Sequence, residues 1–64
     1  MVQELNRAIY EARRKGKYLM IHDSRTPTAG LMLVGAKSDG EYIVVKSTEG
    51  QWHRISEETR FFVA

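Results

Sequence analysis

Gly16 divides this 64-residue chain into two parts whose apolar residues follow different periods. Before Gly16, apolar residues recur every three or four positions, which places them on one helical arc of about 120°. Basic residues fill the last turn of this segment, where the helix dipole favours cations, and a glycine commonly follows a helix end. The pattern predicts a helix over about residues 2–15. Its apolar arc consists of Val2, Leu5, Ala8, Ile9 and Ala12.

After Gly16 the chain reads as short strands separated by turn signals. The segments are rich in β-branched and aromatic residues, which are enriched in strands. Asp39-Gly40 and Glu49-Gly50 predict two tight hairpin turns. The predicted strands cover about residues 17–23, 31–37, 41–48, 51–55 and 60–64.

Three further features concern the connections and the strand ends. Pro27 cannot donate to a strand ladder, so a loop is expected over residues 24–30. Gly35 interrupts the second predicted strand and predicts a bend or a bulge. Ser56 is a suitable N-cap for one turn of 3₁₀ helix over residues 56–59. The connections are thus short enough for a meander, apart from the first loop.

The order of elements predicts one mainly β domain over residues 1–64, with an N-terminal helix followed by a five-stranded small barrel. A chain of this length has room for one domain. Five short strands in a meander remove most of their edges by closing into a barrel. The chain contains no cysteine, which excludes disulfides and thiolate metal sites. A small core without such links often relies on oligomerisation.

The predicted strands carry more apolar residues than one barrel interior takes up. Adjacent Phe61 and Phe62 point to opposite faces of the last strand, and the second strand repeats this arrangement around Met32. We therefore expect a homo-oligomer with Phe61, Phe62 and Met32 at the subunit contact. The alternative is that the loop over residues 24–30 folds over the surplus apolar surface.

The order of elements and several segments resemble the Hfq and Sm-like family of small SH3-like barrels. Residues 3–14 read Gln-Glu-Leu-Asn-Arg-Ala-Ile-Tyr-Glu-Ala-Arg-Arg, similar to the family's opening Gln-Asp-Pro-Phe-Leu-Asn-Ala-Leu-Arg-Arg-Glu-Arg. Gly30 matches the glycine of the family's second strand, and residues 42–47, Tyr-Ile-Val-Val-Lys-Ser, resemble its Val-Ile-Leu-Leu-Lys-Asn third strand. The resemblance implies a barrel that binds RNA and forms rings by pairing the fourth and fifth strands of neighbouring subunits.

The same resemblance indicates which functional residues transfer and which do not. The family's rim arginines correspond to Arg13 and Arg14. The family's Tyr-Lys-His signature, which reads uridine at the pore, does not align with residues 52–54, which are Trp-His-Arg. A longer loop over residues 24–30 replaces the family's Asn-Gly turn. The pore chemistry is therefore not carried over.

Positive charge is concentrated at the start of the chain, although the net charge is only +2. Opposite the apolar arc, the helix carries a stripe that includes Arg7, Tyr10 and Arg14. A tyrosine between two arginines suits base stacking and phosphate binding, and it equally suits an acidic protein surface. The alternative is a solvated helix face. The basic residues of the segment are Arg7, Arg13, Arg14, Lys15 and Lys17.

Trp52 is the only tryptophan, and on a strand it shares one face with Arg54. This pair suits stacking on a base. A lone tryptophan in a small barrel is more often an anchor of the core or of an interface, and we favour that structural role. Trp52 and Arg54 remain candidates for binding nucleic acid or a protein partner.

Catalytic, metal and membrane functions find little support in the sequence. A zinc site needs three or four ligands, and the chain has two histidines and no cysteine. Acid–base catalysis needs a paired acid and base, but adjacent His22 and Asp23 are expected to point to opposite faces of a strand. No phosphate-binding glycine loop or nucleophile motif is present. No apolar run approaches the ~20 residues of a membrane span, and no secretory signal pattern occurs. We expect a soluble cytoplasmic protein without catalytic residues, metal or cofactor.

Two functions fit these observations. The first is a small Sm-like protein that binds nucleic acid and prefers single-stranded RNA. The second is a protein-binding module, or an inhibitor or adaptor encoded by a virus or mobile element, that docks on an acidic surface of a larger partner. RNA binding through several phosphates weakens steeply with salt, whereas an interface anchored by Tyr10 and Trp52 depends less on salt.

Overall fold

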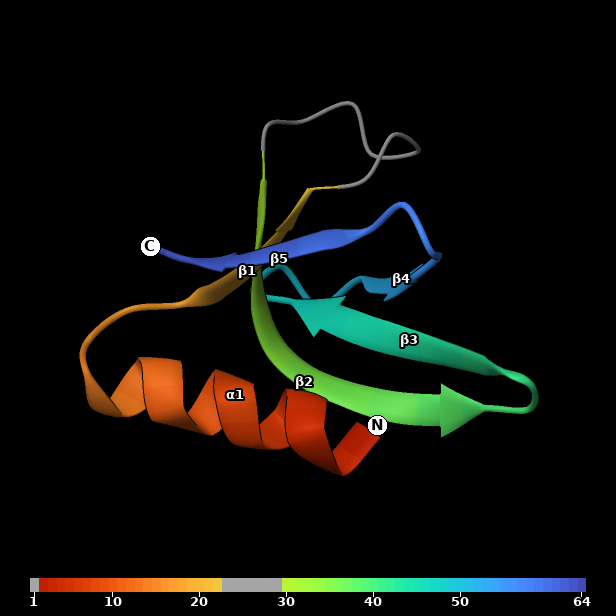
Figure 1. Cartoon of the computed structure of the whole chain (residues 1–64), viewed down its shortest axis with the longest axis horizontal. Coiled ribbons are helices and arrows are strands. Elements are labelled where there is room, and N and C mark those ends of the chain that lie inside the picture. Colours follow the sequence, from red (N-terminus) through yellow and green to blue (C-terminus); the bar gives the residue numbers. More distant parts are fainter. Residues whose placement is uncertain (1, 23–29) are drawn as a thin grey trace.

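A curved antiparallel sheet of five strands packs against one N-terminal helix (Figure 1). The structure is a computed structural model that describes residues 2–22 and 30–64. It confirms the mainly β class with a single leading helix. The elements are α1 (Val2–Arg14), β1 (Leu19–His22), β2 (Leu31–Asp39), β3 (Tyr42–Ser47), β4 (Trp52–Arg54) and β5 (Arg60–Val63).

The sheet has the order β4-β3-β2-β1-β5, and each neighbouring pair is antiparallel. β2 belongs to both halves of the sheet, because its first residues pair with β1 and its later residues with β3. A register shift between Leu33 and Gly35 confirms the predicted bulge, in the strand that bends through the centre of Figure 1. β4 and β5 are the two edges, so the sheet is not closed into a barrel.

The helix forms and ends as its sequence predicts. Ile9 and Ala12 of the apolar arc are buried, and Leu5 and Ala8 pack partly buried beside them. Beyond the helix, Gly16 adopts a φ of 73°, and the N–H of Lys17 donates to the carbonyl of Ala12 at 3.0 Å. This is a Schellman ending, in which glycine avoids the Cβ clash of a left-handed residue.

The core lies between α1 and the inner face of the sheet. Leu19 and Ile21 of β1 point into it, and the strand period places Met20 on the opposite face. Leu33 of β2 and Val45 of β3 have no exposed surface. These side chains form one apolar cluster with the apolar residues of α1. The opposite face of each strand is therefore available to solvent or to a ligand.

A side-chain clamp, which the sequence did not reveal, joins the helix to β2. The Asn6 amide donates through Nδ2 to the carbonyl of Ala36 at 2.9 Å, and its Oδ1 accepts from the N–H of Ala36 at 3.0 Å. Ala36 follows the bulge directly. The clamp therefore satisfies both backbone groups of one residue where the ladder is locally disturbed.

Both predicted hairpins form, but the first turn is one residue later than expected. Asp39 pairs with Tyr42, so the two-residue loop is Gly40-Glu41 rather than Asp39-Gly40. Gly40 has a φ of 63°, and no described residue other than glycine has a positive φ. A type II′ turn needs a positive φ at its first central position alone, which explains why the loop begins at glycine.

The segment between β4 and β5 is a hydrogen-bonded turn and not the predicted 3₁₀ helix. The N–H of Ser56 donates to Oγ1 of buried Thr59 at 2.9 Å, and the N–H of Thr59 donates to the carbonyl of Ser56 at 3.2 Å. Ser56 does cap the turn, since its Oγ accepts from the N–H of Glu58 at 3.2 Å. No helical turn continues because β5 begins at Arg60. The loop predicted over residues 24–30 lies outside the described residues, apart from Gly30.

Candidate nucleic-acid interface

The predicted stripe on α1 is exposed along its whole length. Gln3, Arg7, Tyr10 and Arg14 are all classed as exposed, and 62% of Tyr10 is accessible. Tyr10 lies three residues after Arg7 and four before Arg14, so the three side chains share one exposed face of the helix. The stripe can therefore stack a base and contact its phosphates, as expected for an RNA-binding helix.

Most cations at the end of α1 form no ion pair with an acid among the described residues. In the described part of the chain, one ion pair involves this segment, Arg14 with Glu11 at 3.6 Å, and both side chains are exposed. The Arg13 guanidinium lies 4.0 Å from the centre of the Tyr18 ring. Basic residues remain exposed throughout the segment, namely Arg7, Arg13, Arg14, Lys15 and Lys17.

A second surface with cations and aromatic rings lies on the outer face of β2, β3 and β4. Val45 and Ser47 of β3 are buried on the inner face, so Tyr42, Val44 and Lys46 face outward. The strand register adds neighbours from β2 and β4. We call this surface the outer platform; it consists of Gly35, Lys37, Asp39, Tyr42, Val44, Lys46, Trp52 and Arg54.

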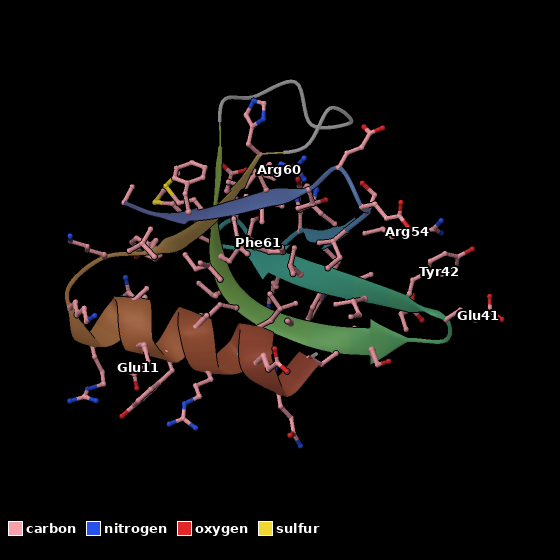
Figure 2. The ribbon with its side chains drawn as sticks, viewed as in Figure 1. Glu11, Glu41, Tyr42, Arg54, Arg60 and Phe61 are labelled. Carbon is pink, nitrogen blue, oxygen red and sulfur yellow. The ribbon has the colours of Figure 1, made fainter. Side chains whose placement is uncertain are left out.

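Cations and rings are paired on the outer platform. The Lys37 and Lys46 ammonium groups lie 4.3 and 5.9 Å from the Trp52 ring centre. The Arg54 guanidinium lies 3.8 Å from the centre of the Tyr42 ring. Figure 2 labels Tyr42 and Arg54 on this part of the sheet. Each pair is a cation–π contact, and both rings keep accessible surface, 43% for Trp52 and 47% for Tyr42.

Trp52 is therefore not an anchor of the core, which corrects one of the two structural roles that we favoured from the sequence. Its role as an anchor of an interface stays a prediction. Trp52 and Arg54 do share the predicted face, and both are exposed. His53 between them is partly buried, and its buried Nε2 has no hydrogen-bond partner in the part of the chain that the structure describes. The alternation of β4 gives the face of each residue. It does not show whether another layer covers that face, and none of the described elements does.

Gly35 leaves an open place on the outer platform. It pairs with Lys46, and a Cβ built on Gly35 meets no atom within 4 Å. Glycine inside a strand often marks a bulge or a close approach of a ligand. Lys37, Tyr42 and Lys46 were missed in the sequence because no local motif contains them. They come together with Trp52 through the register of three strands.

The residues expected at an oligomer contact are exposed but do not form one patch. The register places Met20 beside both Met32 and Phe62, on the face opposite the core. Met32 and Phe62 are 42% and 41% exposed. Phe61 lies on the other face of β5, where it lines an apolar pocket of about 290 Å³ with helix residues. The three residues thus belong to two sides of the β5 edge.

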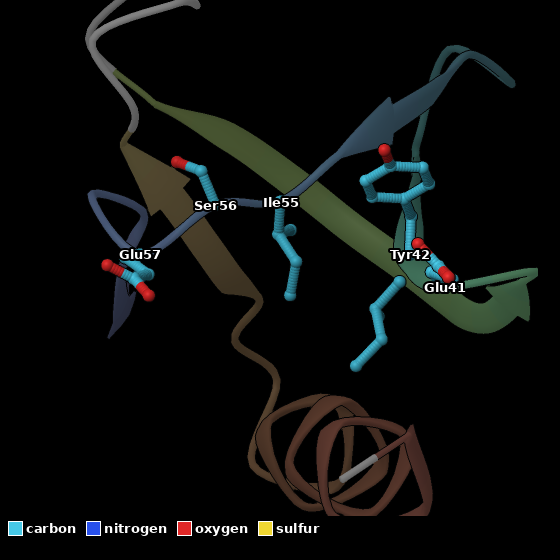
Figure 3. Close-up of a pocket in the computed structure, with 6 residues that line it drawn as sticks. Glu41, Tyr42, Ile55, Ser56 and Glu57 are labelled. Atoms are coloured by element: carbon cyan, nitrogen blue, oxygen red, sulfur yellow. The ribbon is translucent and has the colours of Figure 1, made fainter.

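Two open pockets lie near the strand edges and meet at Ile55. Figure 3 shows the larger, of about 510 Å³, where Ile43 and Ile55 form the apolar part and Glu41 and Glu57 carry carboxylates. These carboxylates disfavour a phosphate ligand. The pocket adjoins the outer platform at Tyr42, but the charges on its own lining are negative. Its six lining residues are Glu41, Tyr42, Ile43, Ile55, Ser56 and Glu57.

The helix surface and the outer platform are far apart on the molecule. In Figure 2, Glu11 of α1 and the pair Tyr42 and Arg54 lie toward opposite sides of the view. The structure thus brings Trp52 and Arg54 together with Tyr42, but not with the helix cations. A ligand that contacts both surfaces would have to be a polymer.

In residues 2–22 and 30–64, no three His, Cys, Asp or Glu side chains form a group that could hold a metal ion. Within the same residues, no helix has the length and apolar character needed to cross a membrane. No family model matches the chain, and no curated protein or solved structure matches it.

Proposed function

We propose that the protein is a small RNA-binding protein of Sm-like type that prefers single-stranded RNA and acts as a homo-oligomer. The observation that carries this proposal is the exposed basic segment at the end of α1, in which Arg14 alone is paired with an acid among the described residues. Exposed arginines and lysines supply the phosphate contacts that dominate affinity for nucleic acid. The phosphate-binding residues are Arg7, Arg13, Arg14, Lys15 and Lys17, with Tyr10 as a stacking residue.

The resemblance to Sm-like barrels supports this assignment. The helix precedes five strands, and β1 lies between β2 and β5, as a barrel would require. Gly30 also fits the glycine of the family's second strand, since a Cβ there would lie 3.1 Å from Cε of Met20 and 3.2 Å from Cζ of Phe62. We propose that the remaining gap between the edges is completed by neighbouring subunits.

The two edge strands are suited to pair with each other between copies. Tyr18 and Ala64 exchange both backbone hydrogen bonds, so the antiparallel alternation directs the N–H and C=O groups of Phe61 and Val63 away from β1. The same alternation directs the backbone groups of Trp52 away from β3. In the described part of the chain, backbone donors and acceptors therefore face outward at both edges, at Trp52 and at Phe61 and Val63, which favours a repeating β4-to-β5 contact.

Charge reversal at the helix end tests the RNA proposal. In fluorescence anisotropy with a labelled single-stranded RNA, we expect the double variant Arg13→Glu with Arg14→Glu to bind at least about tenfold more weakly. Five phosphate contacts give a slope of log affinity against log salt of about −3.5, and losing two contacts reduces it to about −2.

The control for this experiment is Arg60→Glu, an equal charge change per residue on β5, away from the helix. Circular dichroism and light scattering establish that each variant keeps its fold and its oligomeric state. An unchanged affinity in the double variant, or an equal loss in Arg60→Glu, would show that the helix end is not the phosphate site.

A second function is favoured by the apolar pocket between α1 and the edge strands. Leu5, Leu19 and Phe61 line this opening, and an extended segment of a partner protein could add to the β5 edge beside it. Such a contact would depend little on salt, because its energy comes from apolar burial and backbone hydrogen bonds. A pull-down from native lysate that captures the same protein with and without nuclease would favour this protein-binding role.

A further inference from the structure

We infer that the outer platform is a base-stacking site that binds one unpaired RNA base on Trp52, with Lys37 and Lys46 contacting the flanking phosphates. This inference rests on the proposed function and adds a second binding surface to it, away from the helix. The open place at Gly35 gives the ribose or base room beside Lys46.

The Trp52 ring is exposed on the edge strand β4. An exposed tryptophan on an edge strand is unusual, since large apolar rings are normally buried or covered by a partner. Val44 on the same outer face is only 8% exposed, whereas the Trp52 ring keeps 43% of its surface accessible. Apart from the lysine ammonium groups near it, the ring is thus available for stacking.

The outer platform carries more positive than negative charge. The outer platform contains three cations, Lys37, Lys46 and Arg54, against one carboxylate, Asp39 at the hairpin end. The two lysines flank the ring from neighbouring strands. They are long and mobile, so they can leave the ring for phosphates when a base takes their place. Base stacking on an aromatic ring generally outweighs an exposed cation–π contact, which makes this exchange favourable.

The shape of the outer platform suits unpaired bases better than a duplex. A sheet face with an exposed ring meets bases that are unpaired and unstacked, whereas a duplex presents its phosphates and hides its base faces. Stacking tolerates any base, because every base has a flat π-face. The occupant is thus single-stranded RNA with little sequence preference at this position.

Trp52 is the only tryptophan, so its fluorescence reports on this site directly. We expect a short oligouridylate to quench the Trp52 emission with the same midpoint as its binding measured by anisotropy. A duplex of the same length should leave the emission nearly unchanged. This readout uses the unaltered protein and does not depend on the folding of a variant.

Gly35→Val then fills the open place, where no atom lies within 4 Å of the new Cβ and the φ of residue 35 is not positive. We expect an affinity loss of about 5- to 100-fold for oligouridylate, the range of a lost stacking contact. Ser38→Val is the matched control, since it adds the same side chain to the same strand on the opposite face. It should bind like the wild type, and circular dichroism verifies the fold of both variants.

The outcomes separate this inference from the proposed function. Quenching by oligouridylate, together with weaker binding by folded Gly35→Val, supports the inference. Binding with unchanged Trp52 emission and wild-type affinity in Gly35→Val overturns the inference and leaves the helix site standing. If oligouridylate does not bind at all, the proposed function and the inference are both wrong.

Discussion

Asn6 shows how one side chain stabilises this small fold. It spans from the helix to the residue after the bulge with two hydrogen bonds, to the N–H and the C=O of Ala36. This pairing cannot be predicted from the sequence, because an asparagine in a helix has the pattern of an ordinary surface residue. The pairing depends on where the bulge places Ala36, and that is a tertiary feature.

Replacing Asn6 tests this clamp. Asn6→Ala removes both hydrogen bonds, and we expect it to lower the free energy of unfolding by about 1–2 kcal/mol in urea denaturation. Gln3→Ala, on the exposed helix face, should change it by less than about 0.5 kcal/mol. Equal effects of the two substitutions would show that the clamp contributes nothing beyond helix propensity.

Trp52 shows which properties of a single residue could be predicted from the sequence and which could not. The strand period correctly places Trp52 and Arg54 on one face. The exposure of Trp52 was not predictable from the sequence. The strand period gives the face to which a side chain points, but it does not show whether another element packs against that face. The lysines around it were missed for a related reason: the expected turn at Asp39-Gly40 would set Lys37 opposite Tyr42, while the observed turn sets it opposite Val44, nearer Trp52.

At the level of elements, the helix and all five strands form where the hydrophobic periods predict them. The ends differ by at most two residues, because strand ends depend on pairing partners as well as on composition. Sequence could locate the bulge at Gly35 and the glycine after the helix, since both rest on backbone geometry that glycine supplies. It could not show that the sheet stays open, because closure depends on contacts between β4 and β5, which are distant from each other in the sheet.

Two glycines in the same β2–β3 hairpin should respond oppositely to alanine. Gly40→Ala places a Cβ at a φ of 63°, and we expect it to lower the free energy of unfolding by about 1 kcal/mol or more. Gly35→Ala meets neither a positive φ nor a neighbouring atom, so it should be neutral or stabilising. Thermal unfolding followed by circular dichroism measures both. A destabilised Gly35→Ala would contradict the open geometry at the bulge.

At the level of the whole molecule, unfinished burial is the main feature. The radius of gyration is 10.8 Å, close to the roughly 11 Å of a compact chain of this length. Even so, apolar side chains remain exposed along the edges and outer faces, among them Met32, Phe61, Phe62 and Val63. All four residues of β5 are exposed. Assembly of several copies would cover this surface and complete the sheet.

Val63→Pro tests assembly without removing a ladder bond inside the subunit. The N–H of Val63 points away from β1, so proline there blocks pairing at the free edge and is tolerated on an edge strand. Light scattering should give the wild type a mass that is a multiple of 7.4 kDa and give Val63→Pro the mass of one chain. Val63→Ala is the control and should assemble. A wild-type protein of one-chain mass would contradict the proposed oligomer.

The central claim is that this protein binds unpaired RNA through exposed cations and rings. The most direct measurement compares the affinity of the wild-type protein for one labelled RNA as a single strand and as a duplex, by anisotropy at low and at physiological salt. The account predicts tighter binding to the single strand at both salt concentrations, with affinity falling as salt rises. Equal or tighter binding to the duplex, or no binding of either form at low salt, would contradict it.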